Sequence, residues 1–286
     1  MFLVDGTFQV LLASNHPRCC LMYSGRVSLD ITVAFGSLTL LRVLVGQAEE
    51  HSARWRSLTW HALLGEGNSN VLSILPSTLP SLQAVNLFDF DIFDSVFPGC
   101  PRLQAVVLHQ CDGILLHEVD CERATELALG RESIWNLEDV EVLYKFRNVR
   151  RFTLYTVNYI DAIAYSPSEP WVEVLFPRLH SLRLKGELAW VIVRVLKTPV
   201  LKEVEFDMVS SSALFEDASL APTVETVHIR IAKYDAPRST LEMFKGLLTV
   251  VPLLRYITVP KWLSEELESD GLCLEERGVQ LRVATK

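Results

Sequence analysis

The chain has 286 residues, of which 49% are hydrophobic and 22% are charged. Disordered and fibrous proteins lack that much apolar side chain, so the chain must form a folded core. Its formal net charge of -8, from 27 Lys and Arg against 35 Asp and Glu, argues against nucleic acid or an anionic membrane as a partner, because phosphate binding requires clustered cations.

Residues 1–25 are predicted to form an N-terminal capping segment. The stretch is apolar from Phe2 to Leu12, but Asp5 interrupts it, it lacks a basic flank, and no small-residue cleavage pattern follows. Neither a signal peptide nor a membrane anchor is therefore indicated, and we expect an intracellular protein in the cytoplasm or the nucleus. The segment is expected to cover the first repeat, because the ends of a solenoid need caps.

Residues 26–286 are predicted to form about eleven degenerate repeat units. In each unit, apolar residues stand two, five and seven positions after a slot that is often proline. This slot holds six of the 13 prolines, which are Pro80, Pro101, Pro177, Pro199, Pro222 and Pro252. The last apolar residue of each unit falls, in chain order, at Ile31, Trp60, Leu87, Leu108, Leu129, Leu154, Leu184, Phe206, Ile229, Val259 and Val283.

This spacing is that of the leucine-rich repeat, L-x-x-L-x-L-x-x-N/C, and Leu103-x-x-Val106-x-Leu108-x-x-Cys111 matches it best. The predicted fold is an α/β, right-handed leucine-rich-repeat solenoid, or horseshoe, with a parallel inner sheet and short helices or extended segments outside. Proline suits the slot before the strand because its missing N–H falls outside the ladder. The predicted return segments are helices at 133–144, 188–196, 239–250 and 262–268, and a loop at 164–170.

No motif for catalysis, a cofactor or a metal is found. A phosphate-binding loop, a dinucleotide fingerprint, a nucleophile elbow and a zinc-protease motif are all missing from the sequence, so an enzyme is not expected. Asp89, Asp91 and Asp94 lack the glycine and the alternating ligands of a calcium loop, and are expected to form a solvated rim. The cysteines show no Cys-x-x-Cys spacing and are predicted to be reduced and buried; they are Cys19, Cys20, Cys100, Cys111, Cys121 and Cys273.

The block His51-Ser-Ala-Arg-Trp55 precedes one of the predicted strands. Trp55 occupies the first apolar slot of its unit and is predicted to fill the core, and Arg54 could cap a neighbouring carbonyl. This block, Tyr23-Ser-Gly-Arg-Val-Ser-Leu-Asp-Ile31 and the Phe-Pro-Arg-Leu-His-Ser-Leu-Arg-Leu unit ending at Leu184 resemble the leucine-rich-repeat portion of fungal F-box proteins, over roughly residues 20–286.

The resemblance implies the target-binding subunit of a cullin-based ubiquitin ligase. An F-box would need more residues than the 25 before the repeats, so a cullin-ligase adaptor is expected as a partner only if an F-box lies upstream. Three interpretations of the chain follow: a substrate receptor or its truncated relative, a stand-alone repeat scaffold that binds proteins without a ligase role, and an enzyme, which is the least favoured.

The residues between and after the core pair of each strand are expected to line the concave face and to meet a protein partner. The candidate partner-binding residues are His61, Phe88, His109, Tyr155, Arg183 and Lys185. Among them, Phe88, His109 and Tyr155 are hypothesised to form one aromatic recognition patch. The alternative is that the histidines are ordinary surface residues and that the charged residues only pair across strands.

Overall fold

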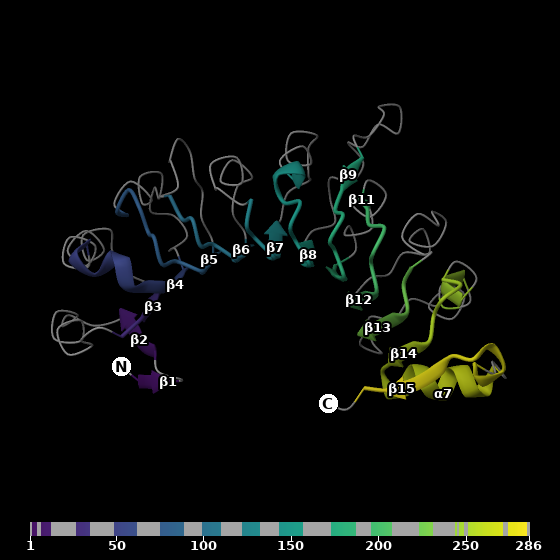
Figure 1. Ribbon diagram of the computed structural model, residues 1–286. Helices are drawn as coiled ribbons and strands as arrows, with labels where there is room; N and C mark the ends of the chain where they lie inside the picture. The colour runs from purple at the N-terminus through teal and green to yellow at the C-terminus, as the bar shows by residue number, and fades with distance from the viewer. Residues whose placement is uncertain are drawn as a thin grey trace. The chain divides into compact units, whose positions relative to one another are not determined.

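The fold is known from a computed structural model, and it consists of two compact units, Met1–Arg131 and Glu132–Lys286. In each unit, parallel strands lie side by side in chain order and are joined by return segments (Figure 1), so each unit is a parallel-strand solenoid. The structure describes residues 2–4, 7–12, 27–34, 49–61, 75–88, 99–109, 122–131, 143–156, 173–186, 196–207, 223–230, 244, 246–248, 251–270 and 274–284.

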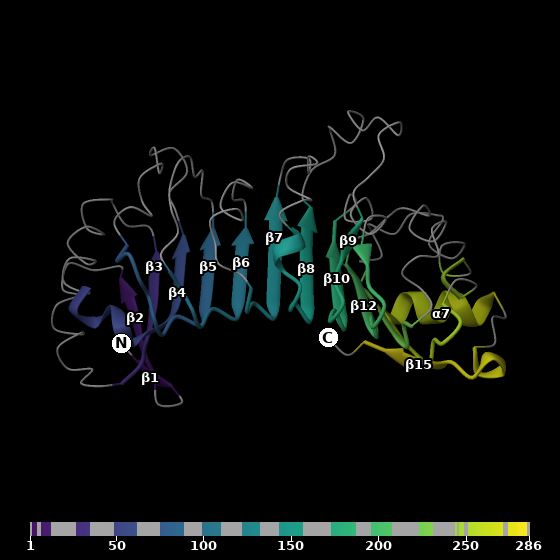
Figure 2. The same cartoon turned by 45° about the horizontal axis from the view of Figure 1, so that its top comes forward.

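In the first unit, the sheet runs in the order β1 to β7, and the arrowheads of β3 to β7 point to the same side in Figure 2. The pair β1–β2 is antiparallel, and the pairs from β2–β3 to β6–β7 are parallel. The elements are β1 (Phe2–Val4), β2 (Thr7–Leu12), β3 (Leu29–Ala34), the 3-10 helix η1 (Glu49–Arg54), β4 (Trp55–His61), β5 (Ala84–Phe88), β6 (Ala105–His109) and β7 (Glu126–Arg131).

In the second unit, the strands of the main sheet pair in parallel in the order β8, β10, β12, β13, β14 and β15, and β9 pairs in parallel with β11. The strands are β8 (Arg151–Thr156), β9 (Val174–Leu175), β10 (Ser181–Lys185), β11 (Leu196–Lys197), β12 (Glu203–Asp207), β13 (Thr226–Arg230), β14 (Tyr256–Val259) and β15 (Gln280–Val283). The helices are η4 (Leu143–Lys145), α7 (Lys261–Ser269) and η8 (Glu275–Arg277).

The pairing of the strands confirms most of the repeat register read from the sequence. In the first unit, Trp60 is the partner of Leu87, and Leu108 is the partner of both Leu87 and Leu129. In the second unit, the successive partners are Leu154, Leu184, Phe206 and Ile229, and Val259 pairs with Val283. Parallel strands share one side-chain phase, so the apolar residues of successive units fall on the same face.

The register predicted for the first repeat is wrong by two residues. Ile31 pairs with Leu58, and Val33 is the partner of Trp60. The pairing of β3 with β4 also shifts by one residue between Leu29 and Asp30. Arg56 is the extra residue at this bulge, since Trp55 pairs with Leu29 and Ser57 with Asp30. In addition, β2 pairs in parallel with β3, so residues 7–12 of the predicted capping segment are part of the sheet.

The core of each unit is built from columns of apolar residues that successive strands share. Both core positions are buried from β4 to β7 and from β8 to β14; examples are Val106, which has no exposed surface, and Leu127, which is 2% exposed. One buried side chain contributes only about 1.5–3 kcal/mol, so a single strand and its return segment cannot hold their shape alone. The last strand departs from the rule, because Val283 is 48% exposed.

The recurring spacing before the strands corresponds to a tight turn, which in several units has proline at its second position. The N–H of Leu103 donates to the carbonyl of Cys100, with Pro101 between them, and Leu179 donates in the same way to Phe176 across Pro177. Proline suits the second position of such a turn because its ring fixes φ near the required value. Both ends of the turn are buried, so the residue before the proline is a further core position that sequence analysis missed.

The predicted return segments are only partly within the described residues. α7 confirms the helix expected at 262–268, and residues 244 and 246–248 are helical inside the segment expected at 239–250. At 143–145 the chain forms the 3-10 helix η4, and residue 196 begins β11 rather than ending a helix, because it pairs with β9. The loop at 164–170 lies outside the described residues. No helix in the described ranges is both long and apolar enough to cross a membrane.

Two neighbouring valines of β6 test whether successive side chains of a strand alternate between the core and the opposite face of the sheet. Val106 has no exposed surface and Val107 is half-buried on the opposite face. Val106→Asp buries a carboxylate, so we expect it to lower the free energy of unfolding by more than about 3 kcal/mol, whereas Val107→Asp changes it by less than about 1 kcal/mol. Urea denaturation of both variants measures the difference, and equal losses would contradict the alternation.

Thr198 offers a test of the turn. It holds the position before Pro199, is 6% exposed, and its hydroxyl has no hydrogen-bond partner, although a buried hydroxyl normally has one. Replacing it with the similarly shaped valine removes this unsatisfied group, so Thr198→Val is expected to stabilise the protein by about 1 kcal/mol. Thr223→Val is the matched control, because that hydroxyl donates to the carbonyl of Leu201 at 2.8 Å, and it is expected to destabilise.

Candidate functional site

The candidate binding surface is the face of each sheet opposite to the core, which we call the open face. Its side chains come from the positions between and after the two buried residues of each strand, and most of them are half-buried in both units. In the first unit these positions bring together His61, Phe88 and His109, and in the second unit they bring together Tyr155, Arg183 and Lys185. The open face differs in chemistry between the units.

In the first unit, three rings from successive strands form a row. His61 ends β4, Phe88 ends β5 and His109 ends β6, and the register makes each the partner of the next. The rings of His61 and Phe88 are stacked, with centroids 4.3 Å apart and planes 10° apart, and the centroid of His109 lies 5.7 Å from that of Phe88 at a tilt of 34°. Both faces of the phenyl ring are therefore flanked by imidazoles.

Gly130 closes this row at β7. It is the partner of His109, and a Cβ atom at position 130 would lie 2.8 Å from Cδ2 of the imidazole, which is closer than real atoms approach. Because Gly130 has no side chain, the His109 ring can pack against the backbone of the neighbouring strand. The sequence placed Gly130 on this face, but its relation to the ring could be found only from the structure.

The remaining open face of the first unit is uncharged beside the rings and polar at the strand entries. Asn86 donates a hydrogen bond to the hydroxyl of Thr59 at 3.0 Å. At the bulge, the Arg56 guanidinium binds both carboxylate oxygens of Asp30, at 3.1 and 2.7 Å, and Ser57 donates to the same carboxylate at 2.7 Å. These contacts fix the edge of the surface.

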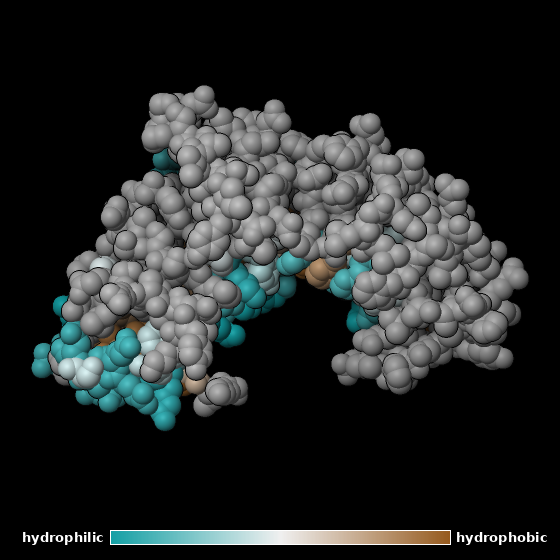
Figure 3. All heavy atoms as spheres, turned by 180° about the vertical axis from the view of Figure 1, so that it is seen from behind, coloured by the Kyte–Doolittle hydropathy of each residue, from teal (hydrophilic) through white to brown (hydrophobic). Residues whose placement is uncertain are grey.

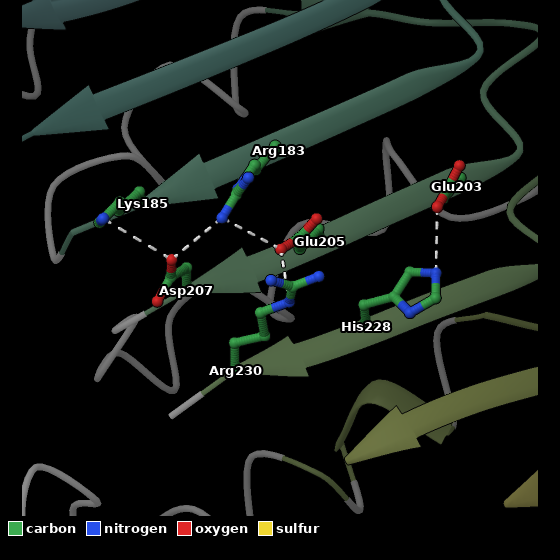
Figure 4. Close-up of polar contacts among 7 residues, drawn as sticks. All are labelled: Arg183, Lys185, Glu203, Glu205, Asp207, His228 and Arg230. Carbon is green, nitrogen blue, oxygen red and sulfur yellow. Dashed lines mark hydrogen bonds and ion pairs between the residues drawn. The ribbon is translucent and has the colours of Figure 1, made fainter. Parts of the chain in front are cut away.

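The second unit presents charges where the first presents rings. Arg183 and Lys185 of β10 face Glu205 and Asp207 of β12, and the Nη2 atom of Arg183 lies 3.3 Å from each carboxylate (Figure 4). The Lys185 ammonium lies 5.6 Å from the centroid of the Tyr155 ring. The cross-strand pairing considered for these residues is therefore present. Tyr155 belongs to this charged surface of the second unit, whereas Phe88 and His109 belong to the first unit, so the single patch expected from these three residues stays a prediction.

Two further arginine and lysine contacts support the strand entries. The Arg54 guanidinium donates twice to the carbonyl of Val27, at 3.0 and 2.7 Å, which confirms it as a cap for a neighbouring carbonyl. In the second unit, the ammonium of Lys202 donates a hydrogen bond to the Glu225 carboxylate at 2.5 Å. This hydrogen bond and the positive charge of Lys202 lower the pKa of the Glu225 carboxyl. The Lys202–Glu225 pair was not predicted from the sequence.

The other candidates from the sequence are either buried in the core or lie outside the described residues. Trp55 is 2% exposed and is a core residue, as predicted. Cys100 is a buried free thiol, as predicted, and the other five cysteines lie outside the described ranges. Asp89, Asp91 and Asp94 also lie outside them. Among the residues that the structure describes, no group of His, Cys, Asp and Glu could hold a metal ion.

No family model matches this sequence, and no curated protein matches it either.

Substitution of Gly130 tests the closed end of the ring row. Gly130→Ala places a methyl group where the His109 ring lies, so we expect the imidazole to rotate away from Phe88 at a cost of about 0.5–1.5 kcal/mol. The chemical shifts of the His109 and Phe88 ring protons measure this movement. Gly99→Ala is the control, since its Cβ meets other atoms only at 3.9 Å, and unchanged ring shifts in Gly130→Ala would contradict the contact.

Proposed function

We propose that the chain is a leucine-rich-repeat protein of the right-handed, horseshoe type that binds another protein on its open face. In this proposal it is the target-binding array of an F-box-type ubiquitin-ligase substrate receptor, or a truncated relative of one, and it acts in the cytoplasm or the nucleus. It has no catalytic, cofactor or metal site, and neither nucleic acid nor a membrane is its partner.

The row of His61, Phe88 and His109 is the observation that carries the proposal. Aromatic side chains concentrate binding energy at protein interfaces because they bury a large area at a small cost in side-chain entropy. Here the rings are held by their mutual stacking and by strands paired on both sides. A partner would therefore meet a surface that is already ordered, and less free energy would be lost on binding.

The composition around the rings also favours a protein partner. Thr59, Asn86, Val107 and Ala128 are the uncharged neighbours of the ring row on the same face. Depletion of charge around an aromatic centre is typical of the core of a protein interface, whereas nucleic acid requires clustered Lys and Arg. The ligase part of the proposal depends on the resemblance to fungal F-box proteins described for residues 20–286.

Affinity capture with the full chain tests the function. The tagged chain, Phe88→Ala and Leu175→Ala are used to capture proteins from an extract of the source organism, and quantitative mass spectrometry compares the three sets. Leu175 is the matched control because it is an apolar residue of the second unit, 51% exposed, on β9 rather than on the open face. We expect Phe88→Ala to lose the target at least about tenfold, as for an interface hot spot, while Leu175→Ala retains it.

The same capture separates the two versions of the function. Recovery of cullin-ligase subunits with all three proteins supports the substrate receptor. Recovery of a Phe88-dependent target without any ligase subunit overturns the ligase role and leaves a stand-alone scaffold. If each captured protein is retained by Phe88→Ala at the level of the control, binding at the ring row is wrong.

A further inference from the structure

The open face of the second unit carries its charges in alternating strands. All three outward residues of β12 are acidic: Glu203, Glu205 and Asp207. The neighbouring strand β10 presents Arg183 and Lys185, and β13 on the other side presents His228 and Arg230. An acidic strand thus lies between two basic ones (Figure 4).

The carboxylates of β12 are contacted by cations from both sides. Glu205 lies 3.3 Å from Arg183 and 2.8 Å from Nε of Arg230, and Asp207 lies 3.3 Å from Arg183 and 3.9 Å from Lys185. Glu203 lies 3.0 Å from Nε2 of His228. The carboxylates of Glu205 and Asp207 are therefore in contact with three cations in total.

The cations lie nearer to solvent than the carboxylates that hold them. The side chains of Glu205 and Asp207 are each 17% exposed, whereas that of Lys185 is 42% exposed and that of Arg230 is 60% exposed. Arg230 contacts Glu205 through Nε, and a guanidinium has four further N–H donors on its terminal nitrogens. An approaching molecule would thus meet positive charge first.

The described strands of this open face carry a positive net charge, although the chain is acidic. Its strands carry Arg151, Arg183, Lys185, Arg230 and Arg282 against three acidic residues, so the difference is +2 with histidine neutral, compared with -8 for the full sequence. Some of the other acidic residues of the unit lie on α7 and η8, where hydrophilic residues cover the surface (Figure 3), and Glu173 and Glu225 pair with Lys197 and Lys202. The positive charge is therefore local to this face.

Internal hydrogen bonding alone does not account for this cluster. Nε of Arg183 is buried without a hydrogen-bond partner, and Oε1 of Glu205 is buried with only its ion-pair contacts to Arg183 and Arg230. Unsatisfied buried groups cost stability, and exposed ion pairs return little of it. What the arrangement does achieve is to fix three cations in place.

We propose that this surface binds an acidic segment of a partner protein, whose carboxylates contact Arg230, Lys185 and Arg282 while the β12 carboxylates hold the first two in position. The inference rests on the proposed function and specifies the chemistry of the partner. Planar guanidinium groups bind carboxylates through paired hydrogen bonds. Because these contacts are exposed, the affinity falls as salt is added, and a partner carboxylate directly over β12 is repelled.

Fluorescence anisotropy with labelled probes tests this inference on the full chain. The probes are a peptide rich in Asp and Glu, a Lys-rich peptide of equal length, and a single-stranded DNA oligonucleotide, each at low and at physiological ionic strength. We expect the acidic peptide alone to bind, and more weakly with salt. Equal binding of the two peptides, tighter binding of the oligonucleotide, or no binding of the acidic peptide overturns the inference.

Charge reversals locate the binding surface. Arg230→Glu and Arg282→Glu are each expected to weaken acidic-peptide binding at least about tenfold, which corresponds to one charge-assisted hydrogen bond. Lys261→Glu is the matched control, because it makes the same charge change at an 81% exposed side chain of α7. Arg282 contacts the Tyr256 ring and no acidic residue among those described, so its variant remains informative if Arg230→Glu fails to fold.

Phe88→Ala separates this inference from the proposed function, because Phe88 lies in the other unit and the variant should bind the acidic peptide normally. Equal weakening by Lys261→Glu and Arg230→Glu would show a nonspecific charge effect and overturn the inference. If Phe88→Ala instead captures each protein at the level of the Leu175→Ala control while the acidic peptide binds normally, the proposed function alone is contradicted.

Discussion

The backbone hydrogen bonds at each strand entry are the constraint on which both units depend. The carbonyl of Gln83 accepts the N–H groups of Gln104 and Ala105, and the carbonyl of Gln104 accepts those of Thr125 and Glu126 in turn. In the second unit, the carbonyls of His180 and Lys202 do the same for their successors. Because one carbonyl receives two donors at the same point of most described repeats, these strands start level with their neighbours. Steps of different length between repeats are absorbed by the return segments and leave the register unchanged.

This level start determines what the open face can present. Side chains two residues apart lie on the same face, and partners on adjacent strands stand about 4.8 Å apart, so residues at equal repeat positions become lateral neighbours. The spacing matches the 4.3 Å between the rings of His61 and Phe88. It also brings the side chains of β12 between those of β10 and β13, where opposite charges neutralise one another. One backbone arrangement thus supports an aromatic row in one unit and an ionic lattice in the other.

Sequence analysis could predict those features that depend on period and composition. Apolar residues at two fixed offsets define the buried columns, and the recurring proline marks the turn. The register of β3 could not be predicted, because Leu29, Ile31 and Val33 alternate along the chain, and a slip of two residues keeps apolar side chains on the same face. Burial of Cys100 was predicted, but the residue before each proline was not recognised as a repeat position, because its chemistry varies, as between Cys100 and Thr198. The contact of the His109 ring with Gly130 could not be predicted from the sequence either, since it depends on the rotation of the His109 side chain and on the absence of a Cβ atom at Gly130.

The buried thiol of Cys100 gives the first unit a chemical reporter of its own motion. Cys100 is 3% exposed and is the first residue of the turn that leads to β6. A thiol in that position reacts with an alkylating reagent only when its repeat separates from the neighbouring ones, because the thiolate must reach solvent. The rate at which the Cys100 peptide becomes labelled under native conditions therefore measures how often this part of the solenoid opens, compared with global unfolding, without any engineered probe.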